Sequence, residues 1–201
     1  MNVTVVDYKV GNIGSLISML SRLNINAKAS SDADCILDSS AIILPGVGAY
    51  DRAMNSLKKL NLIKVLNECV YDKNIPVLGI CLGAQILGKS SEEGEEKGLG
   101  FIDMEVIKFE NKNLSIPHMG WNYVKPTRKS KIFKNLDSDR RFYFVHSYYF
   151  KPKDKNNIES FSNYGDDFVS AVSKNNVYGV QFHPEKSHRF GLQLLKDFFY
   201  E

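Results

Sequence analysis

The sequence predicts an α/β fold in which a parallel sheet carries helices on both faces. Two observations support this prediction. Short apolar runs rich in β-branched residues alternate with segments of helical periodicity through the first half of the chain. The second half consists mainly of strand-like runs separated by turn residues, which indicates meanders or hairpins. A length of 201 residues is most simply one domain, so we expect residues 1–201 to fold as a single unit.

Three buried strands are expected in the first half, at residues 3–8, 41–44 and 76–80. A helix should follow the first strand, because apolar residues recur there at helical spacing: Ile13, Leu16, Ile17, Leu20 and Leu23. Residues 49–72 are also expected to be helical, with a break near Asn61.

The second half predicts further strands and one helix. The strand-like segments lie within residues 104–109, 121–126, 142–150 and 168–182. A final helix is expected over about residues 187–200, where bulky apolar side chains recur. The polar stretches 88–100 and 151–167 are expected to be surface loops.

Composition excludes several classes of protein. The chain has 26 basic and 23 acidic residues, and a formal charge of +3 is too small to indicate a nucleic-acid or membrane-surface partner. No apolar stretch approaches the roughly 20 residues of a membrane span, and the N-terminus lacks the features of a signal peptide. Cys35, Cys69 and Cys81 are widely spaced and form no zinc pattern. We therefore expect a reduced, cytoplasmic enzyme or binding domain without a metal or a cofactor.

A cysteine lies at the sharpest predicted corner of the chain. Gly79-Ile80-Cys81-Leu82-Gly83 is a G-x-C-x-G pattern between a strand and a helix, the cysteine counterpart of the serine nucleophile elbow. The glycines permit a tight turn, and the helix N-terminus favours the thiolate. The backbone amide of Leu82 would be a natural oxyanion donor. The alternative is a structural cysteine buried under the helix.

A nucleophilic cysteine needs a base, and His183 has the most suitable setting. It ends an apolar strand, and Glu185 follows two residues later, which gives the base and orienting carboxylate of nucleophilic catalysis. The alternative is a surface histidine at a strand end. His118 and His146 lie among aromatic and apolar residues and are interpreted as mainly structural or interface residues, while His188 has no supporting context.

A competing motif overlaps the elbow. Residues 83–90, "GAQILGKS", match the phosphate-loop pattern G-x-x-x-x-G-K-[ST]. Residues 84–87 favour a helix rather than a loop, and Gly88 would then be a helix C-cap followed by a polar loop. This context argues against nucleotide binding.

Six motifs together carry a family resemblance. Three resemble the signatures of class I, triad-type glutamine amidotransferases: "PGVGAY" at 45–50, "LGICLGAQ" at 78–85 and "GVQFHPEKS" at 179–187. Three more are similar to motifs of the glutaminase subunits of imidazole glycerol phosphate synthases: "VDY..GN" at 6–12, "PHMGWN" at 117–122 and "YFVHSY" at 143–148. The resemblance covers essentially the whole chain.

The resemblance implies a flavodoxin-like fold with a mixed, largely parallel sheet, and the hydrolysis of glutamine to glutamate and ammonia. Cys81 would attack the side-chain amide carbon. His183 would take the thiol proton and return it to the departing ammonia, and Glu185 would orient His183.

The same resemblance implies the groups that hold the substrate. The oxyanion would meet backbone amides of Leu82, Gly46 and Val47. Glutamine would be bound by side chains from three segments: Gln85, Glu93, Ser147 and Tyr148. Glu93 lies in "SSEEGEE", for which a solvated acidic loop is the alternative interpretation.

A partner chain is implied as well. A chain of this length has no room for a synthetase domain, so ammonia would pass to a TIM-barrel cyclase subunit that makes imidazole glycerol phosphate and AICAR in histidine biosynthesis. Five residues match family positions at or near the heterodimer interface: Asn12, Met119, Trp121, Tyr143 and Lys186. For Trp121, the only tryptophan, a core position is an equal alternative.

Two positions depart from the family pattern. Lys9 stands where the family usually has glycine, and Ala84 stands where methionine is common. The C-terminal motif also resembles paralogues that supply ammonia for amidation of surface-polysaccharide sugars, which is the alternative role within the enzyme class. Two alternatives lie outside this enzyme class: a nucleotide-binding protein that uses residues 83–90, and a catalytically silent binding module with this fold.

Overall fold

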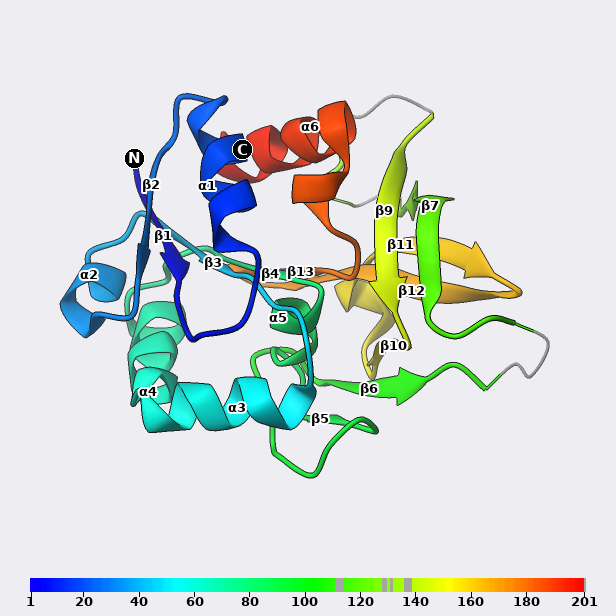
Figure 1. Cartoon of the computed structure of the whole chain (residues 1–201), viewed down its shortest axis with the longest axis horizontal. Helices are drawn as coiled ribbons and strands as arrows, with labels where there is room; N and C mark the ends of the chain where they lie inside the picture. The colour runs from blue at the N-terminus through cyan, green and yellow to red at the C-terminus, as the bar shows by residue number, and fades with distance from the viewer. Residues whose placement is uncertain (111–113, 128–129, 131, 136–138, 201) are drawn as a thin grey trace.

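A long mixed sheet with helices on both faces forms the centre of the molecule (Figure 1). The structure is a computed structural model that describes residues 1–110, 114–127, 130, 132–135 and 139–200. In one half of the sheet the order is β2–β1–β3–β4–β13, and every neighbouring pair is parallel. These strands are β1 (Asn2–Val6), β2 (Asn26–Ser30), β3 (Ala41–Leu44), β4 (Val77–Ile80) and β13 (Val177–Val180). This is a flavodoxin-like strand order, so the predicted fold class is confirmed.

The other half of the sheet is mostly antiparallel. The order continues from β13 through β12, β10 and β6 to β5, and only the β5–β6 pair is parallel. β11 pairs with β12 and β8 beside this path, and β7 and β9 form a separate antiparallel pair. The bounds are β5 (Ser90–Ser91), β6 (Met104–Lys108), β7 (His118–Tyr123), β8 (Lys125–Pro126), β9 (Arg141–His146), β10 (Tyr148–Pro152), β11 (Ile158–Tyr164) and β12 (Asp166–Lys174).

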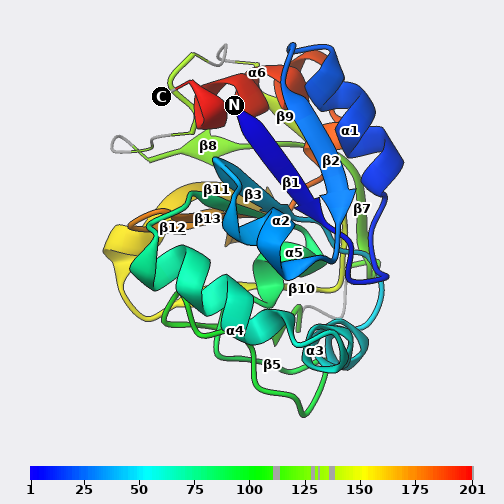
Figure 2. The ribbon, with the colours of Figure 1, turned by 90° about the vertical axis from the view of Figure 1, so that its left-hand side faces the viewer.

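The helices divide between the two faces of the sheet (Figures 1 and 2). α1 (Ile13–Ser21) and α6 (His188–Phe199) cover one face. The other face carries α2 (Ala33–Leu37), α3 (Tyr50–Lys59), α4 (Leu62–Asn67) and α5 (Leu82–Gln85). A π-helical turn (Glu68–Asp72) extends α4, and 3₁₀ turns occur at Lys155–Asn157 and Pro184–Lys186. No helix in the described part of the chain combines the length and hydropathy needed to cross a membrane.

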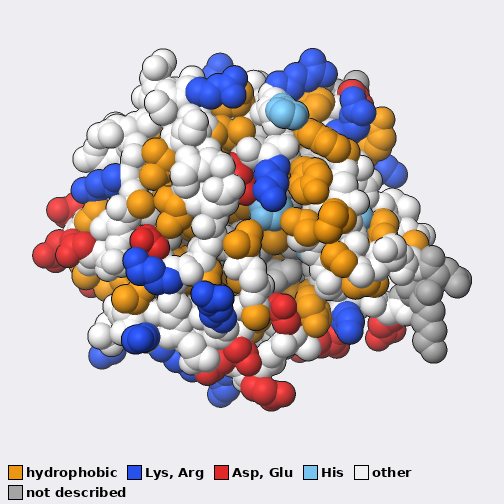
Figure 3. All heavy atoms as spheres, viewed as in Figure 1, with side chains coloured by type: hydrophobic (Ala, Val, Ile, Leu, Met, Phe, Trp, Pro, Cys, Tyr) orange, Lys and Arg blue, Asp and Glu red, His pale blue; other side chains and the backbone are white. Residues whose placement is uncertain are grey.

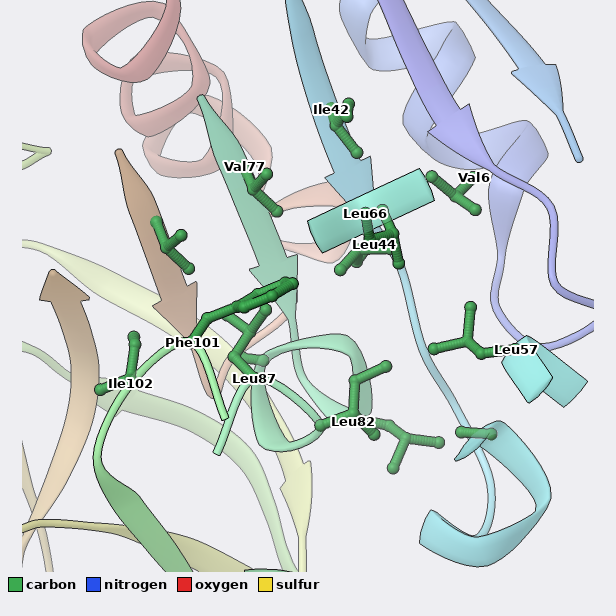
Figure 4. Packing of buried hydrophobic residues seen from close by; sticks show 14 of the residues in the cluster. Val6, Ile42, Leu44, Leu57, Leu66, Val77, Leu82, Leu87, Phe101 and Ile102 are labelled. Atoms are coloured by element: carbon green, nitrogen blue, oxygen red, sulfur yellow. The ribbon is translucent and has the colours of Figure 1, made fainter. Parts of the chain in front are cut away.

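Two buried apolar clusters hold these layers together, one on each face of the sheet. Figure 4 shows the first, where Val6, Ile42 and Val77 project from strands toward the helical layer. The side chains that meet them include Leu57, Leu66, Leu82, Leu87 and Phe101. Leu82 belongs to this cluster, so packing of the core fixes the residue that follows Cys81.

Most predicted elements are confirmed, with the break near Asn61 as the sharpest case. Asn61 has φ 56°, a left-handed conformation that ends one helix and starts the next. The first strand, the strand at residues 41–44 and the final helix agree with their predicted positions within two residues.

The prediction that residues 151–167 form a surface loop is wrong. This segment contains the end of β10, a 3₁₀ turn, the whole of β11 and the start of β12. The polar residues of β11 misled the prediction, because Ser160 and Ser162 are buried and the Ser160 hydroxyl bonds that of Ser170 at 2.9 Å. Polar strand residues that satisfy one another carry no apolar periodicity.

β5, β2 and α2 were also not predicted, and one boundary was misplaced. β5 lies within residues 88–100, so the prediction of a surface loop there is wrong for this short strand. β2 is a polar edge strand, and α2 is a short helix whose Asp32 cap accepts from the Cys35 amide at 2.8 Å. Gly88 does not cap α5, since that helix already ends at Gln85. The strand predicted at residues 121–126 is interrupted: β7 begins earlier, at His118, and β8 starts only at Lys125.

The departure at Lys9 has a structural consequence. Lys9 has φ 67°, a conformation that glycine adopts without strain. Its amide and its ammonium group both bond Asp7, at 3.1 and 2.9 Å. The left-handed conformation explains why glycine suits this position. In this chain, the two bonds to Asp7 stabilise that conformation for a lysine.

Candidate active site

The glycine-flanked cysteine occupies a strained corner at the carboxyl end of β4. Cys81 has φ 53° and ψ −113° and directly precedes α5. A Cβ on Gly83 would lie 1.8 Å from the Leu44 carbonyl oxygen, and one on Gly79 would lie 2.6 Å from the Ala84 Cα. Both glycines are therefore required for the short helix to pack against the strands, as the elbow prediction anticipates.

The thiol is nearly buried and contacts two polar groups. Cys81 is 7% exposed. Its Sγ lies 3.9 Å from the Val145 carbonyl oxygen and 3.7 Å from the Gln181 side-chain nitrogen. The buried Cys69 also contacts a backbone carbonyl oxygen, that of Ile36 at 3.8 Å, so the amide of Gln181 is the contact that favours the prediction of a nucleophile at Cys81.

His183 and Glu185 form a buried pair next to this thiol. His183 Nδ1 lies 2.7 Å from Glu185 Oε1, with side chains 1% and 3% exposed. Burial lowers the pKa of His183, but the interactions of the ring with the Cys81 and Glu185 side chains outweigh burial and raise the pKa above its ordinary value. Within the described residues, His183 Nε2 has no hydrogen-bond partner. The alternative of a surface histidine is excluded.

A pocket of about 260 Å³ opens above the thiol. Its walls contain the cysteine, the histidine and all four side chains expected to bind substrate: Cys81, His183, Gln85, Glu93, Ser147 and Tyr148. The pocket lies beyond the carboxyl ends of β3, β4 and β13, where ligands bind in open α/β sheets.

Glu93 is held in the pocket wall rather than dispersed in solvent. Its Oε2 accepts from the Tyr50 amide at 3.2 Å, and burial raises its pKa. The next turn is fixed by Asp51, which accepts from the amides of Glu95 and Glu96 at 3.2 and 3.0 Å. A solvated acidic loop is therefore an insufficient description of this segment.

The glycine-containing turn after β3 packs against the elbow. A Cβ on Gly46 would lie 2.4 Å from the Gly83 amide nitrogen, so only glycine fits there. Leu82 is the first residue of α5, and its amide has no acceptor within the helix. Val47 and Leu82 both line the pocket. The backbone segments expected to form an oxyanion hole are thus adjacent.

The phosphate-loop alternative does not fit this geometry. Residues 83–88 are all buried, and 83–85 are helical. No exposed loop in this segment presents amides to a phosphate group.

His118 and His146 form a buried hydrogen-bonded chain beside the pocket. His146 Nδ1 donates to the Tyr148 carbonyl oxygen at 2.7 Å, and its Nε2 lies 2.9 Å from His118 Nδ1. His118 Nε2 lies 3.1 Å from the side-chain nitrogen of Asn122. Burial lowers the pKa of His118 to about 4 and that of His146 to about 3. Both rings are neutral near pH 7, and a structural role agrees with this arrangement.

These two histidines predict a loss of stability in mild acid. Below pH 6.5 an unfolded chain protonates both rings while the folded chain does not, so the free energy of unfolding falls as the pH falls toward 4. Each ring contributes a slope of about 1.4 kcal/mol per pH unit. We expect His118→Gln to remove about half of the combined slope in urea unfolding between pH 6.5 and 4.5. His188→Gln, at an exposed histidine, is the control; equal slopes in wild type and His118→Gln would contradict the prediction.

Comparison with known proteins agrees with this geometry. The family model for glutamine amidotransferase class-I matches residues 4–201. The chain belongs to this family. As a class I glutamine amidotransferase it is a glutamine-hydrolysing enzyme, and the predicted enzyme class is confirmed.

Similar proteins narrow the family further. The chain is 51% identical over 197 residues to imidazole glycerol phosphate synthase subunit HisH 2 of Pseudomonas aeruginosa, and 50% identical over 197 residues to HisH 2 of Methanococcus maripaludis. Each alignment covers 98% of both proteins. The predicted resemblance to glutaminase subunits of this synthase is confirmed.

Solved structures related to this amidotransferase share the fold at low sequence identity. PurLQS from Thermotoga maritima aligns with a TM-score of 0.78 at 17% identity, over 99% of this chain and 97% of that one. A glutamine amidotransferase from the same organism aligns with a TM-score of 0.68 at 20% identity, over 98% of this chain and 81% of that one.

Two residues of this amidotransferase site were not predicted from the sequence. The buried Tyr8 hydroxyl donates to the Pro45 carbonyl oxygen and anchors the turn after β3, and burial raises its pKa. Gln181 is fully buried beside Cys81. The available signal for Gln181 was a polar residue inside the apolar run "GVQF".

Proposed function

We propose that this chain is the cytoplasmic glutaminase subunit of an imidazole glycerol phosphate synthase, with Cys81, His183 and Glu185 as its catalytic triad. The observation that best supports this proposal is the difference between the two ring nitrogens of the buried His183 side chain. Nδ1 is engaged by Glu185 at 2.7 Å, while Nε2 is free of partners among the described residues and shares a pocket with the thiol.

This arrangement supports formation of a thioester. Cys81 gives its proton to His183 Nε2, and the thiolate attacks the amide carbon of glutamine. The carbonyl oxygen gains negative charge and is met by backbone amides at Leu82 and in the Gly46–Val47 turn. The imidazolium then donates its proton to the amide nitrogen, the C–N bond breaks, and ammonia leaves.

Hydrolysis of the thioester uses the same groups in reverse. His183 accepts a proton from water, and the resulting hydroxide attacks the thioester carbon. The C–S bond breaks as the tetrahedral intermediate collapses, which releases glutamate, and the imidazolium returns its proton to the Cys81 sulfur. Glu185 holds one imidazole tautomer and stabilises the charged ring throughout.

Glutamine is proposed to enter with its side-chain amide toward Cys81. The carboxylate of Glu93 suits the substrate's ammonium group, and Ser147 and Tyr148 line the same pocket. Both hydrogens of the Gln85 side-chain nitrogen are directed to Tyr148 O and to the Gln181 side chain, at 3.3 and 3.2 Å. Gln85 therefore offers its oxygen to the ligand.

The ammonia is proposed to pass to a TIM-barrel cyclase subunit. Ammonia released into water is protonated and loses its nucleophilicity, so a sheltered path to the acceptor is needed. The cyclase subunit would use this ammonia to make imidazole glycerol phosphate and AICAR in histidine biosynthesis. The relatives' names, which describe subunits of a synthase, support this assignment.

The proposed docking face combines exposed apolar groups with a lysine. Figure 3 shows hydrophobic side chains gathered right of centre on this face, over β7 and β9. Met119 and Trp121 are 61% and 46% exposed, and Asn12 and Lys186 are exposed too. The Lys186 ammonium lies 5.6 Å from the Tyr143 ring centre. Exposed large apolar side chains close to a catalytic pocket fit a permanent partner.

Trp121 is expected to anchor the partner. Its ring stacks on His188 with centroids 5.6 Å apart, so the exposed indole is already oriented. We expect Trp121→Ala to weaken binding of the cyclase subunit by about 30-fold, roughly 2 kcal/mol, by titration calorimetry. Tyr200→Ala, at a similarly exposed aromatic in the C-terminal segment, is the control. An unchanged dissociation constant for Trp121→Ala would contradict this role.

The function is tested by glutamate release from glutamine in the presence of the barrel subunit. The measurement compares mixtures with and without the nucleotide intermediate of the histidine pathway. Release that the intermediate switches on supports the proposed role. Release that ignores the intermediate favours the polysaccharide-type role, and absence of release in every mixture contradicts the triad.

A further inference from the structure

Gln181 is a buried polar side chain with an unusual neighbour. It directly follows β13 and lies two residues before His183, and none of its surface is exposed. Its nitrogen Nε2 lies 3.7 Å from Cys81 Sγ, and its oxygen Oε1 accepts from Gln85 Nε2 at 3.2 Å. A buried amide costs stability unless its polar groups are bonded, so the pairing with sulfur is a specific feature.

The orientation of this amide follows from the network around it. The nitrogen and oxygen of a glutamine side chain have similar shape, so hydrogen bonds must distinguish them. The Tyr148 carbonyl oxygen only accepts, so Gln85 must present its NH₂ group there, at 3.3 Å. The same NH₂ group faces Gln181 and requires an oxygen from it. The NH₂ group of Gln181 is then the group directed at the sulfur.

We propose that Gln181 is a further catalytic residue that donates an N–H to the Cys81 thiolate and stabilises its negative charge. This inference rests on the proposed role of Cys81 as nucleophile. The neutral thiol has an acceptor in the Val145 carbonyl oxygen at 3.9 Å. The thiolate loses that bond and needs donors instead, because it forms in a site closed to most water.

Other ionisable groups around the thiol have different tasks. His183 supplies the compensating positive charge, and Glu185 acts on it through Nδ1. Tyr8 faces the thiol from the segment after β1, but its hydroxyl donates to Pro45 O. His146, from β9, bonds Tyr148 O and His118. Once His183 has taken the thiol proton, its imidazolium also faces the sulfur. Among the neutral side chains of the described residues, Gln181 is the one that donates to the sulfur.

The same donor serves both halves of the reaction. It lowers the cost of the thiolate before attack on glutamine. When the thioester breaks, the C–S electron pair returns to sulfur, and the Gln181 N–H meets the charge that develops there. Gln181 touches the sulfur rather than the substrate, so its loss should lower kcat and leave KM nearly unchanged.

The test is the pH dependence of Cys81 alkylation by iodoacetamide, followed by mass spectrometry of the Cys81 peptide in the full-length protein. In this reaction the thiolate forms an S–C bond and iodide leaves. Gln181→Met removes the donor, and we expect it to move the alkylation midpoint up by roughly one pH unit, a tenfold loss of thiolate at lower pH. Gln181→Glu retains the shape and an acceptor for Gln85 but places a carboxylate beside the sulfur, so its shift should be larger.

Gln193→Met is the matched control, since this glutamine lies in α6 and bonds Asp197 rather than the pocket. It should leave the midpoint and glutaminase activity unchanged. If folded Gln181→Met has the alkylation midpoint of the wild type, the inference is wrong. The inference is also wrong if neither Gln181 variant folds, because Gln181 would then have a structural role in the core. Either result leaves the triad standing, since the triad fails only if Cys81 proves dispensable for glutamine hydrolysis.

Discussion

Cys81→Ser is expected to lower kcat for glutamine hydrolysis by about 10⁴-fold or more, with no loss of folding. The serine hydroxyl is a far weaker acid than a thiol, so the proposed transfer of its proton to His183 is much less favourable. The shorter C–O bond also withdraws the nucleophile from the position that the elbow gives to sulfur. Glutamate release is measured in the complex with the cyclase subunit, at saturating glutamine.

Cys35→Ser provides the matched control. Cys35 lies in α2, outside the residues that line the active-site pocket, and its sulfur is close to the Thr4 hydroxyl at 3.7 Å. The same atomic change should leave glutamate release unchanged there. If Cys81→Ser retained more than about one hundredth of wild-type turnover, covalent catalysis by this residue would be rejected.

The elbow was predictable because its constraints are local. Gly79 and Gly83 flank Cys81 in the sequence, and the same two positions have no space for a Cβ in the structure. Glycines at fixed spacing around a nucleophile indicate positions where a side chain would not fit. The pairing of His183 with Glu185 was predictable for a similar reason, since the partners are only two positions apart.

The surroundings of the thiol depend on contacts between distant segments, and those were not predictable. Gln181 is 100 positions from Cys81, and Gln85 is 63 positions from Tyr148. Within "GVQF" the glutamine resembles a polar interruption of a strand. Only the topology that places β13 beside β4 brings its amide to the sulfur.

Polar but buried segments account for the main error in the fold. β11 buries Glu159, Ser160 and Ser162, and the Ser173 hydroxyl bonds Glu159 Oε1 at 2.5 Å. Apolar periodicity is the basis of strand prediction, and a strand whose buried positions are paired polar groups has none. The prediction of the pocket was unaffected, because none of the described residues that line it belongs to β11.

Gly83→Ala is expected to destabilise the fold strongly, by about 3 kcal/mol or more. The added methyl group would lie 1.8 Å from the Leu44 carbonyl oxygen and 2.7 Å from its carbon, which are backbone atoms of a central strand. No side-chain rotation relieves such a clash, so α5 must move away from β3. That movement also displaces Leu82 from the first apolar cluster and shifts the amide proposed for the oxyanion.

Gly14→Ala is the matched control for that substitution. Gly14 is exposed in α1, and a Cβ there would meet nothing within 4 Å. Alanine is favoured over glycine by roughly 0.5–1 kcal/mol in a helix interior, and by less at Gly14, which is the second residue of α1, so this variant should be slightly more stable than wild type. The two glycine-to-alanine changes are therefore expected to move the urea midpoint in opposite directions. Equal urea midpoints for the two variants would mean that the elbow relaxes around the methyl group. The backbone around Cys81 would then be less rigid than the Gly83 contact indicates.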